Sequence, residues 1–362
     1  RPHTRRAAAT ARKRERAGGV ARTGRRVRHA LHRGAMATSA ATTITLSLAS
    51  GAVAHGLRWA PSVAAAASAG PRCILLHGWL DNAASFTFLA PRLAAAGVGP
   101  IVALDFPGHG LTSAATPAPG LPAPPQIGDY VSFVHEAAEA LGWADFALVG
   151  HSLGAGVSAV FAGTFPDRVT SLTSLEALGP ESRDADVAPR QLRESVRSVA
   201  SLRAKAAAGP KKAYATLDEA VAARVAKVGT LPGAQYLSDG AARAMVTRGT
   251  GPAEGGGVRF LHDAMTLAPS RQSLTEEQVL AFLREVQCPH LGVTAIDGWP
   301  FPAERMGRRI EVLHQCPGGF THHHLPGSHH HHLDEDTAHV VAELVERFLV
   351  QQRQRTTMHS SL

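Results

Sequence analysis

The sequence predicts an α/β protein with a mostly parallel central sheet, helices on both faces and an inserted helical cap. From residue 73 onward, short apolar runs typical of buried strands alternate with helical segments, which is the pattern of a parallel sheet covered by helices. This alternation of strands and helices stops between residues 179 and 286, where the apolar residues of Ala/Arg/Lys-rich segments have helical spacing. The chain has 362 residues, 44% of them apolar, enough for a large core and an insertion.

The predicted sheet begins with a hairpin. Residues 43–48 alternate with period two, residues 52–59 do so more loosely, and Ser50-Gly51 between them favours a turn. The strands expected after it are 73–76, 101–104, 146–149, 169–175, 291–296 and 310–314, with helices at 84–96, 129–141 and 337–349.

The strand pattern divides the chain into a core and a cap. Residues 43–178 and 287–350 are predicted to form the α/β core, and residues 179–286 the cap, with helices near 190–208 and 217–228. A cap closes over the substrate and largely sets specificity, so the sequence predicts the reaction better than the substrate.

Residues 1–35 form a basic extension. They hold 12 of the 37 Lys and Arg residues and one of the 29 acidic ones. The remaining 25 basic and 28 acidic residues carry a net charge of −3, so the chain is basic, at +8, because of this segment. Two interpretations are favoured: upstream sequence absent from the mature protein, with Met36 as a plausible start, and an organellar transit peptide. A nucleic-acid-binding arm is disfavoured, so no nucleic-acid partner is expected.

Cellular location is predicted only coarsely. A cytoplasmic protein is expected, or an organellar one if residues 1–35 are a transit peptide. The final residues Ser360-Ser361-Leu362 resemble a peroxisomal Ser-Lys-Leu address but lack its basic residue, which makes that location a weak alternative. No apolar run reaches the roughly 20 residues of a membrane span.

A dense histidine cluster suggests metal binding, but the rest of the cysteine and histidine pattern disfavours it. The three cysteines lack metal-ligand spacing and are predicted to be buried free thiols in a reducing compartment. Residues 322–332 contain seven histidines, but runs of one residue rarely aim several rings at one point, and the His-Glu-x-x-His spacing is absent. We therefore expect neither a metal nor another cofactor.

The most informative motif is Gly-His-Ser-Leu-Gly at residues 150–154. It follows the apolar run 146–149 and precedes the small-residue stretch 155–162. A Gly-x-Ser-x-Gly turn between a strand and a helix forces the serine into a strained conformation and exposes its hydroxyl at the edge of the sheet. Ser152 is therefore the predicted nucleophile.

An oxyanion hole is predicted from the turn after residues 73–76, which reads His-Gly-Trp. Negative charge develops on the carbonyl oxygen during attack by a serine, so backbone N–H donors are needed beside it. We expect these donors to be the N–H groups of Trp79 and Leu153.

A serine needs a base, and the base needs an acid that orients it. Two acids follow predicted strands after the serine. Asp297 ends the run 290–296 and is preferred; Glu176, after 169–175, is the alternative. Asp105 also ends a strand, but there it is expected to bind the backbone of its own loop.

The predicted base is His329. It lies in Pro-Gly-Ser-His, after the expected strand 310–314 and before the final helix, and His332 is the alternative. His151 and Trp299, which neighbour the nucleophile and the acid in sequence, are expected to line the substrate pocket.

These motifs resemble one known family. Residues 76–86, 105–113 and 150–154 resemble the serine hydrolase-like proteins, a branch of the α/β-hydrolase superfamily, and residues 248–250 and 258–263 are similar to that family's cap. Its histidine loop is similar to residues 326–333. The resemblance covers residues 43–350 and implies a Ser/His/acid hydrolase whose substrate is poorly defined. The family pattern around the acid is variable.

The sequence thus predicts a serine hydrolase of carboxylic esters, thioesters or similar small acyl compounds, acting through an acyl-enzyme. A carbon–carbon bond hydrolase or a perhydrolase could use the same triad, and a non-catalytic ligand-binding protein of this fold is the alternative from another class. Epoxide hydrolysis and dehalogenation require an aspartate in place of Ser152. The sequence gives no oligomeric state.

Overall fold

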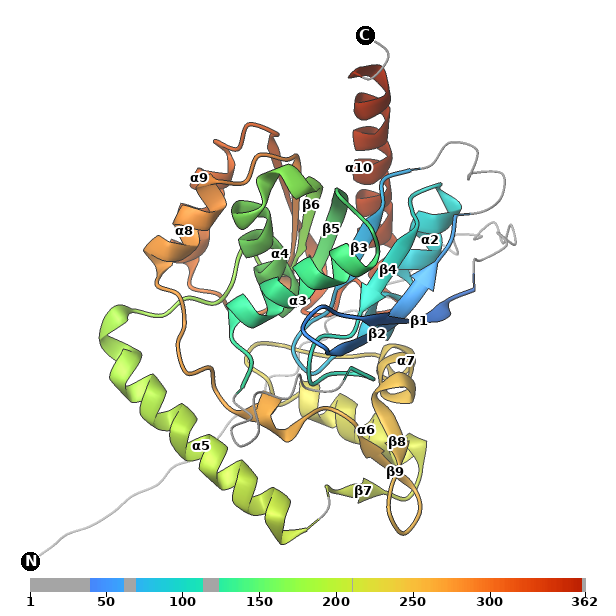
Figure 1. Ribbon diagram of the computed structural model, residues 1–362, viewed down its shortest axis with the longest axis vertical. Coiled ribbons are helices and arrows are strands. Elements are labelled where there is room, and N and C mark those ends of the chain that lie inside the picture. The colour runs from blue at the N-terminus through green and yellow to red at the C-terminus, as the bar shows by residue number, and fades with distance from the viewer. Residues whose placement is uncertain (1–39, 62–69, 113–123, 210, 360–362) are drawn as a thin grey trace, which may run out of the picture. The chain divides into compact units, whose positions relative to one another are not determined.

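The structure is a computed structural model that describes residues 40–61, 70–112, 124–209 and 211–359. Its centre is an eight-stranded sheet in the order β1-β2-β4-β3-β5-β6-β10-β11 (Figure 1). β1 and β2 pair antiparallel, β2 joins β4 antiparallel, and every later pair is parallel. The predicted fold class is confirmed.

The strands follow the apolar runs of the sequence. The four residues of β3 and the four of β4 are all buried, because helices cover both faces of the sheet there. In β1 and β2, at the edge of the sheet, more buried and more exposed residues instead alternate along the strand. The strands are β1 (Thr42–Ser47), β2 (Val53–Trp59), β3 (Cys73–Leu76), β4 (Ile101–Leu104), β5 (Phe146–His151), β6 (Val169–Leu175), β10 (His290–Asp297) and β11 (Phe320–Ser328).

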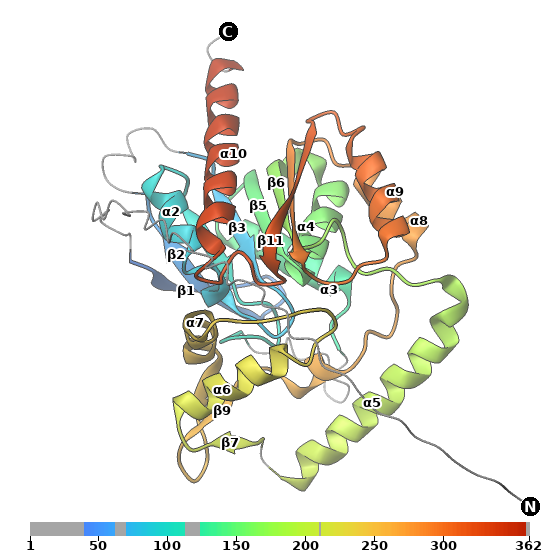
Figure 2. The ribbon, with the colours of Figure 1, turned by 180° about the vertical axis from the view of Figure 1, so that it is seen from behind.

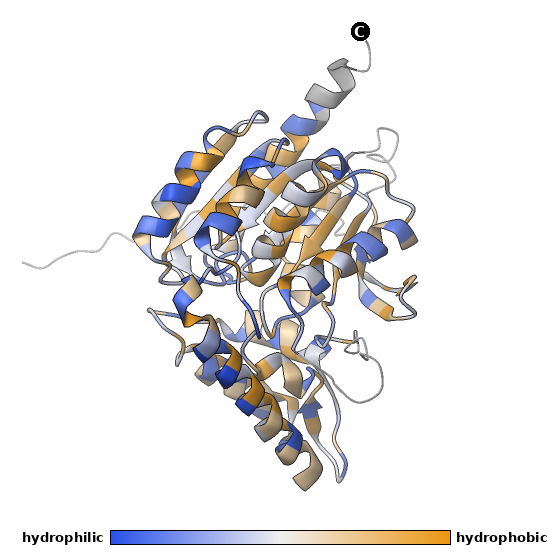
Figure 3. Cartoon of the chain, turned by 60° about the vertical axis from the view of Figure 1, so that its left-hand side comes forward, coloured by the Kyte–Doolittle hydropathy of each residue, from blue (hydrophilic) through white to orange (hydrophobic). Residues whose placement is uncertain are grey.

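Helices pack on each face of the sheet. One hydrophobic cluster joins the strands to α3 (Ile127–Ala140) and α4 (Leu153–Thr164), and another joins them to α2 (Leu89–Ala95) and α10 (Ala338–His359). α8 (Glu276–Arg284) and α9 (Ala303–Leu313) extend the first layer beside α4. Figure 2 shows α10 and α2 in front of the strands, and Figure 3 shows apolar residues concentrated on the strands.

The inserted segment is a mixed cap. It contains α5 (Ala188–Ala208), α6 (Leu217–Val228) and α7 (Asp239–Gly249), where helices were expected. It also contains a three-stranded sheet of β7 (Ala213–Tyr214), β9 (Val258–Phe260) and β8 (Thr250–Pro252), which the helical prediction missed because these strands are two or three residues long. α8, predicted as cap, packs instead against α4 and α9 of the core.

One predicted strand is wrong. Residues 310–314 belong to the end of α9 and the residue after it, and the strand that completes the sheet is β11, ten residues later. The β-branched Ile310 and Val312 favoured a strand locally, but buried residues of α9 lie at Arg309 and Leu313, four apart on one helical face.

The three cysteines are buried and unpaired, as predicted. Burial raises the pKa of the Cys288 thiol to about 12, which makes it unreactive at neutral pH. Among the residues that the structure describes, no helix is both long and apolar enough to cross a membrane. The basic segment 1–35 lies outside the described residues, as do residues 360–362.

Candidate active site

Ser152 lies in a sharp turn between β5 and α4. Its backbone has φ 52° and ψ −114°, a strained conformation for a residue with a side chain. The flanking glycines make the turn possible, because a Cβ on Gly150 would lie 2.3 Å from the Gly154 carbonyl oxygen and one on Gly154 would lie 2.0 Å from the Leu76 carbonyl oxygen. The predicted elbow geometry is therefore present, and the Ser152 side chain is partly exposed.

His329 follows β11 and is 8% exposed. Its Nδ1 lies 2.8 Å from the Glu176 Oε2, so Nδ1–H donates to the carboxylate. Its Nε2 makes no hydrogen bond with any described residue. This tautomer leaves a lone pair on Nε2, as a general base needs.

Glu176 directly follows β6 and is held by the backbone of a neighbouring strand. Its carboxylate accepts hydrogen bonds from the N–H of Ala295 (2.5 Å) and the N–H of Trp299 (2.9 Å), besides the one from His329. Gly298 passes so close that a Cβ there would lie 2.4 Å from Glu176 Oε2. Glu176 itself has φ 62°, which turns its side chain toward this loop.

Asp297, the preferred acid of the sequence analysis, is not beside the histidine. It ends β10 as an exposed residue, and its carboxylate forms neither a hydrogen bond nor an ion pair with the described part of the chain. Its backbone carbonyl accepts a hydrogen bond from Gln235. The structure therefore pairs His329 with the alternative acid, Glu176. The residues after Asp297 contribute by turning the backbone around that carboxylate.

The two predicted oxyanion donors are both available. Leu153 is the first residue of α4, so its N–H has no partner within the helix. The N–H of Trp79 makes no hydrogen bond to another described residue, while the indole Nε1–H donates to the Thr266 carbonyl. His77 orders this loop, since its Nδ1–H donates to the Gly78 carbonyl and its Nε2 accepts from the Phe106 N–H.

His332, the alternative base, lies away from both acids. Its Nε2 is 2.8 Å from the Ser85 Oγ, and its ring packs 4.1 Å from the ring of His151. It is buried, as are His330 and His331. Of the four consecutive histidines 329–332, His329 is the one that hydrogen-bonds to the carboxylate of Glu176.

His151, expected to line the substrate pocket, instead contacts the histidine loop from inside the core. It is fully buried, and its Nε2–H donates to the His329 carbonyl. Its Nδ1 faces Asp81 at 3.6 Å, and His330 faces the same Asp81 oxygen at 3.4 Å. Asp81 is also paired with Arg224 of the cap at 2.6 Å. Trp299 differs from His151, because its ring lies 5.6 Å from that of His329 and lines a cavity.

Asp105 has the structural role that the sequence predicted. Its carboxylate accepts from the Leu111 N–H in its own loop and from the Ala83 N–H in the loop that carries Trp79. Arg248 of the cap binds both carboxylate oxygens, at 3.1 and 2.7 Å. Asp105 therefore connects two loops of the core to the cap.

Gln235, a cap residue, contacts the site, and the sequence analysis did not predict this role. Its Oε1 accepts from the His329 N–H, and its Nε2 donates to the carbonyls of Asp297 and Gly298. One side chain thus joins the histidine loop to the loop that holds Glu176. Nothing in the sequence around Gln235 indicates this role, because its partners are 62 to 94 residues away.

Burial sets the electrostatics of the site. It lowers the pKa of His329 well below its usual value, an effect that the neighbouring His151 and His330 strengthen, so the ring is neutral at rest. Burial also raises the pKa of Glu176, against the effect of the nearby His331 and the two backbone N–H groups. Over the described residues, no group of three or more His, Cys, Asp or Glu side chains is arranged to hold a metal ion.

Comparison with known proteins identifies the class. Residues 71–210 match the family model of the alpha/beta hydrolase fold. A hypothetical protein from Pseudomonas aeruginosa PAO1 has a similar structure, with a TM-score of 0.69, 37% identity, and coverage of 86% of this chain and 99% of that one. The thioesterase domain from the curacin biosynthetic pathway shares the fold at 21% identity and a TM-score of 0.66, covering 84% and 99%.

Sequence relatives narrow this class. A serine hydrolase-like protein of Dictyostelium discoideum is 30% identical over 279 residues, 74% of this chain and 72% of that protein. A probable serine hydrolase of Drosophila melanogaster is 27% identical over 75% of this chain and 80% of its own. The chain belongs to the serine hydrolase-like family of α/β-hydrolase proteins, as the motifs predicted.

Proposed function

We propose that this protein is a serine hydrolase that cleaves carboxylic esters or thioesters of small acyl groups. The observation that carries the proposal is the pairing of His329 with Glu176, which leaves Nε2 unprotonated while Ser152 occupies a strained elbow at the carboxyl edge of the same sheet. A buried acid, an oriented neutral imidazole and a partly exposed, strained serine together are the requirements of nucleophilic acyl transfer.

The reaction proceeds in two halves. The Ser152 Oγ attacks the carbonyl carbon while His329 Nε2 takes its proton, and the N–H groups of Trp79 and Leu153 bind the oxyanion. The tetrahedral intermediate then expels the alcohol or thiol, which receives that proton. Water attacks the acyl-enzyme with His329 again as base, releasing the acid and Ser152. Glu176 stabilises the imidazolium in both halves without being protonated.

The test is labelling and turnover with the full chain. We expect Ser152 to react with a fluorophosphonate probe, and the Ser152→Ala variant to lose labelling and about 10⁵–10⁶-fold in kcat on nitrophenyl esters from acetyl to long acyl chains. Ser158→Ala is the matched control, because its buried hydroxyl lies on the same helix α4 and makes no hydrogen bond. A chain that neither labels nor hydrolyses these esters above the Ser152→Ala rate would refute the proposal in favour of a binding protein.

A further inference from the structure

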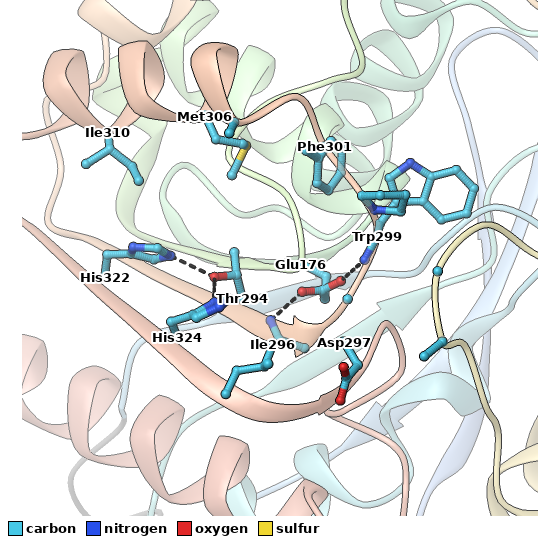
Figure 4. Close-up of a pocket in the computed structure, with 16 residues that line it drawn as sticks. Glu176, Thr294, Ile296, Asp297, Trp299, Phe301, Met306, Ile310, His322 and His324 are labelled. Atoms are coloured by element: carbon cyan, nitrogen blue, oxygen red, sulfur yellow. Dashed lines mark hydrogen bonds between the residues drawn. The ribbon is translucent and has the colours of Figure 1, made fainter.

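The cavity that Trp299 lines lies beside the candidate acid, at the edge of the sheet. It has a volume of about 590 Å³, within the range of small-molecule sites, and neither Ser152, Leu153 nor His329 lines it. We call it the edge pocket (Figure 4). Its walls come from Glu176, the end of β10, the turn 298–301, one face of α9, β11, and residues 233–234 of the cap.

The walls of the edge pocket are mainly apolar. Met306 of α9 lies next to Phe301 of the turn, and Ile310 of α9 lies above His322 (Figure 4). Ile296 is 59% exposed, although it sits between buried residues of β10 and this cavity. A large apolar side chain left in water beside a cavity gains burial when an apolar ligand enters.

A small polar group lies at the other side of the pocket. The Thr294 hydroxyl is 2.9 Å from Nε2 of His322 and 3.0 Å from Nδ1 of His324 (Figure 4). A hydroxyl has one proton, so it donates to one ring and accepts from the other. The remaining nitrogens, His322 Nδ1 and His324 Nε2, have no hydrogen-bond partner among the described residues. Whichever arrangement holds, one of them is a donor and the other an acceptor.

Charge limits the ligand further. The only charged groups among the residues that line the pocket are the carboxylates of Glu176 and Asp297, and no lysine or arginine lines it. An anion would therefore enter against like charge with no cation to pair with it. Burial and the adjacent histidines lower the pKa of His322, so this ring stays neutral near pH 7.

We propose that the edge pocket is a ligand site separate from the nucleophile, and that it takes a neutral amphiphile: an apolar chain or ring with a carboxamide-type head. The apolar part packs on Ile296, Met306 and Ile310, and the head both donates to and accepts from the two histidines. A carboxamide supplies one acceptor and two donors, matching the pair in either tautomeric arrangement.

This site adjoins the machinery that holds the candidate acid. The pocket is lined by Trp299, whose N–H binds Glu176 and whose ring neighbours His329. A ligand there contacts the segment that orients the acid without occupying the space above Ser152. If the proposed hydrolase function holds, octanamide should change kcat for a small ester at least two-fold and leave KM unchanged. Competition with the ester would overturn the separation of the two sites.

The direct test is binding, independent of turnover. In the Ser152→Ala protein, saturation-transfer NMR should detect octanamide, with octanoate at pH 8 binding at least ten-fold more weakly. Ile310→Trp fills the cavity and should abolish binding, whereas Glu311→Trp places the same side chain on an exposed position of α9 and should leave it intact. Thr294→Val, which removes the bridging hydroxyl but keeps the shape, should weaken octanamide at least three-fold.

Three outcomes would overturn the proposal: no octanamide binding, binding unaffected by Ile310→Trp, or octanoate binding as well as octanamide. None of them depends on whether Ser152 hydrolyses esters. Failure of the hydrolase proposal would instead appear as absent turnover in the wild-type chain.

Discussion

The proposed mechanism depends on the assignment of Glu176 as the acid, and the Glu176→Gln variant tests this assignment. The substitution preserves size but replaces a carboxylate that accepts three hydrogen bonds, from His329 Nδ1 at 2.8 Å and from the N–H groups of Ala295 and Trp299. An amide NH₂ group cannot accept a hydrogen bond. In the place of Oε1 this group faces the Ala295 N–H unfavourably. In the place of Oε2 it faces the Trp299 N–H, and His329 changes tautomer to accept from it.

The second arrangement puts the proton of His329 on Nε2, where it can no longer accept the Ser152 proton. A wrong tautomer in a Ser-His-acid triad lowers kcat by about 10⁴, which is about 5.5 kcal/mol of transition-state stabilisation. We therefore expect Glu176→Gln to lose 10³–10⁴-fold in kcat, as an order-of-magnitude estimate, with KM little changed.

Asp297→Asn is the matched control, because Asp297 is exposed and its carboxylate forms no hydrogen bond or ion pair with a described residue. We expect it to keep kcat within two-fold. Both variants are assayed on nitrophenyl acetate and butyrate, with Ser152→Ala as the background and thermal unfolding as a check on folding. If Asp297→Asn lost as much activity as Glu176→Gln, or if Glu176→Gln stayed within ten-fold of wild type, the assignment would be refuted.

Four further predictions concern the histidine loop, the loop that holds Glu176, and the buried histidines. Gly298→Ala places a Cβ 2.4 Å from Glu176 Oε2 and should lower kcat at least ten-fold, while Gly307→Ala, with open space around it, should not. His332→Ala should reduce the free energy of unfolding by about 2 kcal/mol, since a buried ring and its Ser85 hydrogen bond are lost, yet leave kcat within three-fold. His329→Ala should abolish turnover. In acid, unfolding should begin near pH 5, measured by circular dichroism. A buried histidine has a lower pKa in the folded chain than its value of about 6.5 in the unfolded chain. The free energy of unfolding therefore decreases as the pH falls below 6.5, by about 2 kcal/mol for each such histidine at pH 5. Three of them have pKa values lowered by burial to about 3 or 4: His109, His290 and His331. An acid midpoint below pH 4 would contradict this.

The architecture was predictable because local patterns and the fold agree. In runs such as Cys73–Leu76 every residue is apolar, so both faces of the strand are apolar. This pattern is typical of a sheet that is covered by helices on both faces. The nucleophile elbow was predictable for the same reason. The motif contains Gly150 and Gly154, where the backbone segments lie too close together for a side chain. The prediction of a strand at 310–314 was wrong because it relied on two β-branched residues. The buried face of helix α9 is defined by its packing against α8, which the local sequence does not show.

The acid could not be decided from the sequence, and the reason is geometric. Glu176 and Asp297 end strands β6 and β10, which are neighbours, so both reach the same edge of the sheet. Propensity and chain order fit either residue. What separates them is a set of contacts between segments more than 100 residues apart: the Ala295 and Trp299 N–H groups point at Glu176, and Gly298 leaves room for its carboxylate. An acid held by three donors is positioned, whereas an exposed one without partners is not. The turn after Asp297 thus serves the other carboxylate: Trp299 donates its N–H to Glu176, and Gly298 leaves the space that Glu176 occupies.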